Sequence, residues 1–290
     1  MAQQARDQLG RFGIWRSSGQ VTPELAASIE ELGYGALWLG GSPSGDLLQA
    51  GQLLAATTTL TIATGIVNMW QDDDPHQVAT SFHRVQAQHP GRFLLGVGAG
   101  HREATQRYAR PYETLAGYVD VLLADGVPKG SLVLAALGPR VLRLAAERTA
   151  GAHPYLVTPE YTRQARAILG SAPLLAPEQK VVLDTDPGRA RALGRGRVRT
   201  PYLGLVNYTT NLRRMGWTDD DLSGGGSDAL IDALVAHGSA ADVAARLTAH
   251  LDAGADHVCL QLLTAPDADP VDGYRQLAQA LSLPHPHHAG

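Results

Sequence analysis

The sequence predicts an α/β protein that folds as an eight-stranded (β/α)8 TIM barrel. Eight short apolar runs recur along the chain, and nearly all are followed by an amphipathic segment that begins with helix start signals. The runs are continuously apolar rather than alternating, as strands of a parallel sheet covered on both faces are. The chain has 290 residues, 44% of them hydrophobic, which is enough for one barrel.

The first half of the chain contains four of these units. Thr22 and Pro23 are a typical helix start, and Gly33 is a typical helix end. The predicted strands are 12–15, 36–39, 60–67 and 93–97, and the predicted helices are 22–32, 46–56, 75–89 and 112–124.

The second half contains the other four units and one long excursion. The predicted strands are 132–136, 152–157, 179–183 and 257–263, and the predicted helices are 139–149, 159–169, one beginning at 187, 240–253 and 270–281. Residues 202–238 form an insertion between the seventh and eighth strands, where barrels often carry lids or interface elements. No linker divides the chain, so we expect one domain over 1–290, with a flexible tail at 284–290.

A doubly wound open sheet is the alternative fold. Such a sheet usually has fewer strands and a glycine-rich phosphate-binding turn after the first one. Here the first strand is followed by Arg16-Ser17-Ser18-Gly19, which lacks the dinucleotide fingerprint. The barrel is therefore the favoured prediction.

Composition narrows the possible functions. The formal net charge of −4 gives no support for nucleic-acid binding or for a polybasic membrane contact. Cys259 is the single cysteine, which excludes an internal disulfide and cysteine-rich metal sites. No run approaches the roughly 18 apolar residues of a membrane span, and residues 1–11 lack a signal-peptide core. We expect a cytoplasmic protein that acts on a small molecule.

Barrel enzymes place their active sites at the carboxyl ends of the strands, and that rule selects candidates here. No carboxylate pair, metal-ligand spacing or nucleophile elbow stands out there, so no metal is expected, and Lys180 lies at the start of its strand. This apolar, aromatic and glycine-rich mouth suits a flat aromatic cofactor better than it suits hydrolysis. The candidate cofactor-binding residues at these ends are Trp38, Gly40, Thr64, Gly65, Ile66, Asn68, Gly98, Gly100, His153 and Tyr155.

Two helix starts suggest where a phosphate would bind. Gly138 permits a tight turn, and Pro139 takes the first helical position, so the free N–H groups of the next turn point at an anion. Thr158 begins the following helix in the same way. Either start alone is equally well explained as ordinary capping, whereas the pair at adjacent strand ends indicates a phosphate site.

His101 follows the glycine-rich end of the fourth strand and is the candidate catalytic residue. Its unperturbed pKa of about 6.5 suits proton exchange near neutral pH, which would make it a general acid. A solvent-facing loop histidine is the alternative interpretation.

The order of these segments resembles the luciferase-like monooxygenase superfamily, and within it the F420-dependent oxidoreductases of actinobacteria. The segments are 32–38, 62–68, 89–100, 136–140, 145–148 and 150–152, and the resemblance spans residues 13–263. It implies a TIM barrel, a non-prolyl cis peptide at Gly65-Ile66 beneath the cofactor ring, a phosphate near Gly138, and a homodimer. Relatives often carry Asp-His after the second strand and a glutamate after the fourth. Gly40-Gly41 and His101 stand there instead, so those proton-handling roles do not carry over.

Three functions follow as hypotheses. The first is an oxidoreductase that transfers a hydride between coenzyme F420 and a small organic substrate. The second is a monooxygenase that uses reduced FMN and O2. The third is a barrel that binds the cofactor without turnover.

Overall fold

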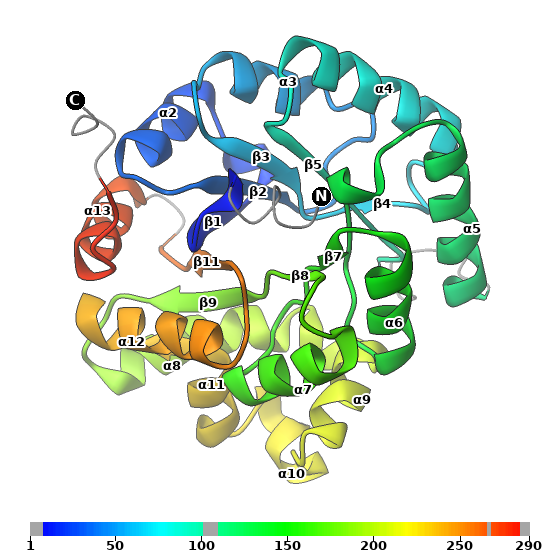
Figure 1. The fold of residues 1–290 in the computed structure, drawn as a ribbon. Coiled ribbons are helices and arrows are strands. Elements are labelled where there is room, and N and C mark those ends of the chain that lie inside the picture. The colour runs from blue at the N-terminus through cyan, green and yellow to red at the C-terminus, as the bar shows by residue number, and fades with distance from the viewer. Residues whose placement is uncertain (1–7, 101–109, 266–267, 285–290) are drawn as a thin grey trace.

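The computed structural model describes residues 8–100, 110–265 and 268–284. A curled parallel sheet forms the centre and helices surround it (Figure 1). The strands are β1 (Phe12–Ser17), β2 (Ala36–Gly40), β3 (Thr61–Thr64), β4 (Val67–Asn68), β5 (Phe93–Gly98), β6 (Leu132–Leu134), β7 (Gly151–Ala152), β8 (Leu174–Leu175), β9 (Glu178–Val182), β10 (Val235–His237) and β11 (Val258–Leu262). The predicted α/β barrel class is confirmed.

The sheet curls back on itself through one bent segment. Its strands run in the order β10-β9-β11-β1-β2-β3-β5-β6-β7-β8, with β4 paired to β5. Only Ala176 and Pro177 separate β8 from β9, and β8 pairs with β7 whereas β9 pairs with β11. The stretch from β8 to β9 therefore connects one end of the strand order, β8, to the strand next to its other end.

Several of the helices that cover the sheet begin at a side-chain cap, as predicted for Thr22 and Thr158. Thr22, Asp74, Thr158, Asp186 and Ser239 each accept a backbone N–H in the first turn of the helix that follows. The helices are α2 (Pro23–Glu31), α3 (Leu48–Ala55), α4 (Pro75–Gln88), α5 (Pro111–Ala124), α6 (Pro139–Arg148), α7 (Pro159–Leu169), α8 (Pro187–Arg199), α9 (Val206–Arg214), α10 (Asp219–Leu222), α11 (Asp228–Leu234), α12 (Ala240–Asp252) and α13 (Val271–Ala280). Within the described ranges, no helix is long and apolar enough to cross a membrane.

Three strand predictions need correction. The predicted strand 60–67 is interrupted between β3 and β4, and the Gly65–Ile66 peptide bond there is cis, as the resemblance implied. The predicted strand 152–157 is reduced to β7, because Pro154 has no N–H for a ladder bond. The short strand β8 was not predicted.

The insertion at 202–238 is mostly helical. It contains the 3-10 turn Tyr202–Gly204, then α9, α10 and α11, and it ends in β10. β10 was not predicted, and it pairs in parallel with β9 from Lys180 to Val182. The insertion is thus anchored to the sheet.

Apolar side chains form three clusters, and the one that includes Val198, Tyr208 and Leu230 packs the insertion against α8. The other two form layers on either side of the sheet. The larger layer lies between the sheet and the helices. The smaller one consists of residues from different strands, including Ala36, Trp38, Ala63, Leu94, Val133 and Cys259. These side chains alternate along their strands with those of the larger layer, so they fill the barrel interior.

Candidate cofactor site

A cavity of about 490 Å³ opens at the carboxyl ends of the strands. Its wall includes Trp15 at the end of β1, the Gly65–Asn68 break, and the segments that follow β5, β6 and β7. None of the described residues on this wall is Asp, Glu, Lys or Arg. An uncharged pocket of this size suits a mostly apolar ring system with a few polar edge atoms.

Three buried polar atoms converge beside Gly65. A Cβ placed on Gly65 would lie 3.0 Å from Tyr155 Oη, 3.2 Å from Trp15 Nε1 and 3.3 Å from His153 Nε2. None of these three atoms makes a hydrogen bond of good geometry within the described structure, although the Trp15 and Tyr155 groups are close enough to interact with each other. Buried polar groups are normally satisfied, so an unpaired group of three on a cavity wall indicates a ligand that completes them.

The protonation state of His153 follows from its surroundings. Burial lowers the pKa of His153 to about 3, so the ring is neutral at physiological pH. Its Nδ1 lies 2.6 Å from the Ala176 carbonyl oxygen, which can only accept, so Nδ1 carries the proton and donates. Nε2 is therefore an acceptor facing the cavity. Trp15 Nε1 can only donate, and the Tyr155 hydroxyl can do both.

Seven of the predicted cofactor-binding residues line this cavity. Gly100 has φ +55°, and a Cβ there would lie 2.5 Å from Asn68 Nδ2, so a larger residue would disturb this part of the wall. The seven are Gly65, Ile66, Asn68, Gly100, Gly138, His153 and Tyr155.

Six predicted residues are not on the cavity wall, and four of them support it from behind. Trp38 is fully buried, stacks on His153 with 3.9 Å between ring centroids, and donates to His257. Thr64 Oγ1 donates to the Gly96 carbonyl oxygen at 2.8 Å. Gly40 makes room for the Trp15 ring, and Gly98 makes room for Ala135 and Ile66.

The other two belong to the predicted phosphate site, where only one of the two predicted helix starts lines the cavity. Gly138 caps α6 and lines the cavity, whereas Pro139 does not. Thr158 caps α7 with its own hydroxyl, which accepts from Tyr161 N at 3.2 Å, and it too is away from the cavity. Only the start of α6 therefore faces the cavity. His101 lies outside the described residues.

Several wall residues were missed by sequence reasoning. Tyr202, Asn207 and Tyr208 come from the insertion, and the Tyr202 and Tyr208 rings meet edge to face at 4.8 Å. The exposed Arg214 at the end of α9 has Nη1 3.6 Å from where a Cβ of Gly138 would lie. No local pattern marks these residues, because they reach the site through the long path of the insertion.

Lys180 also needs correction. It was placed at the remote end of its strand, but its buried side chain faces a second cavity at the carboxyl end of the barrel, beside Tyr202. Across the described residues, no group of three or more His, Cys, Asp or Glu side chains is arranged to hold a metal ion.

Residues 9–124 match the family model described as luciferase-like monooxygenase. No curated protein sequence matches the chain.

Solved structures resemble the fold along nearly its whole length. An F420-dependent secondary alcohol dehydrogenase in complex with an F420-acetone adduct has a TM-score of 0.72 at 17% identity, over 93% of this chain and 98% of that one. The F420-dependent tetrahydromethanopterin reductase of Methanopyrus kandleri has a TM-score of 0.66 at 15% identity, over 94% and 98%.

A third structure is the oxygenating constituent of 3,6-diketocamphane monooxygenase from Pseudomonas putida, in complex with FMN. It has a TM-score of 0.66 at 14% identity, over 95% of this chain and 98% of that one. The resemblance to luciferase-like monooxygenases is thus confirmed by the family model over residues 9–124, and the fold is shared along nearly the whole chain.

Proposed function

We propose that the protein is an F420-dependent oxidoreductase that transfers a hydride between the deazaflavin and a small organic substrate. The observation that carries a flavin-type cofactor is the group of three unpaired polar atoms beside Gly65, in a cavity whose described wall has no charged side chain. The likeness to F420-dependent enzymes is consistent with it.

The residues on the wall fit a deazaflavin. One edge of such a ring alternates carbonyl oxygens with N–H groups, and the three atoms offer a donor, an acceptor and a hydroxyl that can be either. Ile66, Ala99 and Ala136 would contact the ring itself. The free N–H groups at the start of α6, with Arg214 close by, would hold the phosphate.

The bound cofactor would supply the hydride chemistry, and the protein would supply orientation and exclusion of water. Trp15 would fix the ring edge by donating a hydrogen bond, and neutral His153 would do so by accepting one.

His101 remains the proposed general acid. Replacing it with Asn should lower turnover and change the pH profile, and an unchanged rate across pH would remove it from that role.

An FMN-dependent monooxygenase is the second candidate. The family model matched by residues 9–124 is that of luciferase-like monooxygenases, and the FMN complex from Pseudomonas putida has the same fold. The same hydrogen-bonding edge is present in both ring systems, so the wall alone accommodates either.

Fluorescence titration of the purified protein with F420 and with FMN tests the proposal. We expect F420 to bind more tightly than FMN.

Trp15→Phe removes one donor and should weaken cofactor binding about tenfold, since an unpaired buried partner costs about 1–3 kcal/mol. Trp217→Phe, outside the cavity wall, is the control. Tight FMN binding without F420 binding would contradict the proposal, and F420 binding without turnover of any substrate would indicate a non-catalytic barrel.

A further inference from the structure

A second cavity of about 420 Å³ adjoins the first one. It lies at the carboxyl ends of β1, β9 and β11, beside the end of α8, and Figure 1 shows these three strands next to one another. Trp15, Pro201 and Tyr202 line both cavities. A ligand in one cavity therefore lies next to a ligand in the other.

The charges on the two walls differ. The second cavity is lined by Arg16, Lys180 and Arg197, and none of the described residues on its wall is acidic. Arg16 makes only long hydrogen bonds to uncharged oxygens, 3.3 Å to Gln20 O and 3.4 Å to Tyr274 Oη. In the described part of the chain, neither Arg16 nor Arg197 forms an ion pair. Two positive charges are therefore left to attract an anion.

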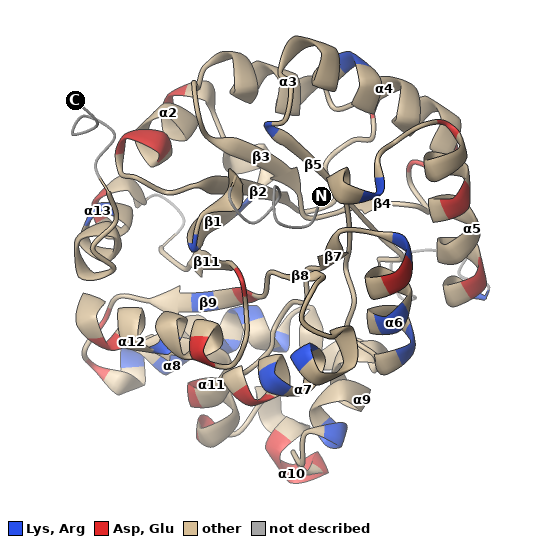
Figure 2. Ribbon diagram, in the orientation of Figure 1, with Lys and Arg blue, Asp and Glu red and all other residues tan. Residues whose placement is uncertain are grey.

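The positive charge of Lys180 is balanced by Glu178, which does not line the cavity. The Lys180 Nζ lies 3.1 Å and 3.2 Å from the two carboxylate oxygens of Glu178. Both side chains are buried in β9, on which Figure 2 shows a basic and an acidic position. The Lys180 Nζ also lies 4.6 Å from the centre of the Tyr202 ring. The pair thus holds an ammonium at the junction of the two cavities without cancelling the charge of the arginines.

Gln261 supplies a further polar group. It pairs in register with Lys180, lines the second cavity, and its buried Oε1 has no partner within the described structure. Because an amide can present its oxygen or its NH2, this side chain can also donate to an anion.

We propose that the second cavity binds the carboxylate of a small organic acid, whose uncharged part extends past Trp15 and Tyr202 into the cofactor cavity. Guanidinium groups bind carboxylates through paired, charge-assisted hydrogen bonds, and Arg16 and Arg197 are the groups available for it. As a statement of substrate class, the proposal rests on the proposed function. The anion site itself does not.

Calorimetric titration of the cofactor-free protein with hexanoate, hexanol and hexylammonium tests the proposal. Hexanoate should bind, and the neutral and cationic analogues should not bind measurably. Its affinity should exceed that of butyrate by about fourfold per added methylene, because the chain enters an apolar space. Binding of hexanol as tight as that of hexanoate, or no gain over butyrate, would overturn the proposal.

Two variants locate the site. Arg16→Gln/Arg197→Gln should weaken hexanoate binding at least tenfold. Arg199→Gln removes one positive charge from the same helix as Arg197, off the cavity wall, and should change nothing. Equal affinity in all three proteins would overturn the assignment. Titrating the same proteins with F420 and FMN separates the two proposals. Hexanoate binding without cofactor binding contradicts the proposed function but supports the anion site. Cofactor binding without hexanoate binding contradicts the anion site but not the proposed function.

Discussion

At the scale of single residues, the site depends on space left by Gly65. The three polar atoms around it come from β1 and from the segment after β7, which are far apart in the sequence. Their unpaired state costs stability in the free protein, because each buried group has lost its water without gaining a partner. A ligand that satisfies them recovers that cost on binding.

Gly65→Ala tests this directly. The added methyl would lie 3.0–3.3 Å from the three polar atoms, so it fills the place where ligand atoms would meet them. We expect cofactor affinity to fall at least tenfold while thermal stability changes little, since each contact needs a shift of only a few tenths of an ångström. Gly51→Ala, with nothing within 4 Å of the new methyl, is the control. Unchanged affinity in Gly65→Ala would place the ligand elsewhere.

A second residue-scale prediction concerns the phosphate. Arg214 is exposed and close to Gly138, so its charge should add modestly to the field of the α6 N-terminus. Arg214→Gln should weaken binding of the phosphorylated cofactor about three- to fivefold and leave binding of the same ring without phosphate unchanged. Equal losses for both ligands in a fluorescence titration would exclude a phosphate contact.

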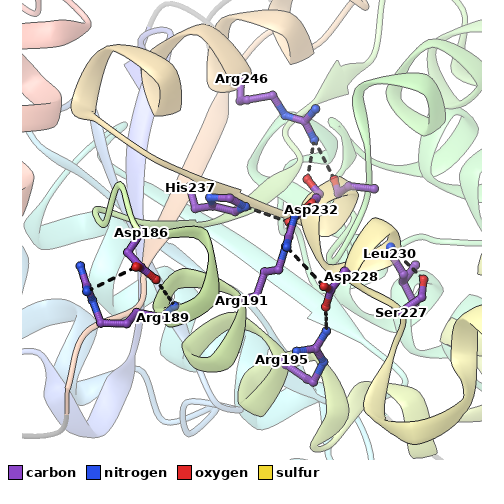
Figure 3. A network of polar contacts seen from close by, with 11 residues as sticks. Asp186, Arg189, Arg191, Arg195, Ser227, Asp228, Leu230, Asp232, His237 and Arg246 are labelled. Atoms are coloured by element: carbon purple, nitrogen blue, oxygen red, sulfur yellow. Dashed lines mark hydrogen bonds and ion pairs between the residues drawn. The ribbon is translucent and has the colours of Figure 1, made fainter.

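At the scale of elements, ion pairs fasten the insertion to α8. Arg191 on α8 donates through Nε and Nη2 to the Asp232 carboxylate on α11, at 2.8 Å and 2.6 Å. His237 at the end of β10 contacts the same carboxylate at 2.8 Å, and Arg195 pairs with Asp228 one turn earlier on α11 (Figure 3). The hydrogen bond from Arg191 is the largest effect that holds the pKa of Asp232 below its usual value.

Asp232→Asn should loosen this attachment. The substitution removes the negative charge that Arg191 and His237 both contact. Because the carboxylate is about a third exposed, we expect the free energy of unfolding to fall by about 1–2 kcal/mol. Hydrogen exchange should quicken in α11 and β10 before it does in β1. Asp219→Asn, whose pair with Arg213 is far more exposed, is the control and should cost under about 0.5 kcal/mol. Uniform exchange changes would contradict a local role.

At the scale of the whole molecule, the eight units were predictable because their signals are local. Caps such as Thr22 and Asp186 and apolar runs such as 93–97 depend on neighbours in sequence. The cofactor cavity was partly predictable for the same reason, since the barrel rule selects strand ends. That rule cannot tell which side chains face inward, so Trp38 and Thr64 were chosen although they lie behind the wall.

What sequence could not predict depends on distant pairing. β9 pairs with β11 along one edge, so its other edge is left for β10. Nothing within residues 235–237 signals this pairing. The position of Lys180 follows from its ion pair with Glu178 and its contact with Tyr202 of the insertion. Both features depend on contacts that form only when the sheet has closed.

Three buried histidines make the stability of the whole fold depend on pH. Burial lowers the pKa of His153 and His250 to about 3 and that of His257 to about 4. In the unfolded chain each would titrate near 6.5. Below that pH the unfolded state binds protons that the folded state excludes, so stability falls as pH falls from about 6.5 toward 4. Most carboxylates titrate at lower pH, so the histidines dominate the change in stability between pH 7 and pH 5.5.

Urea unfolding at pH 7 and pH 5.5 should therefore show a loss of about 3–4 kcal/mol, roughly 1 kcal/mol for each histidine. His250 is hydrogen-bonded to Thr162 and Gln179, so His250→Gln lowers stability at both pH values, but it should reduce the difference between them by about a third. Leu247→Ala removes buried packing from the same helix but no titratable group, so it should lower stability at both pH values and leave the difference unchanged. Because the readout is a difference within each protein, it separates proton linkage from lost packing. An identical difference in His250→Gln and the unmodified protein would mean that folding does not lower the pKa of His250.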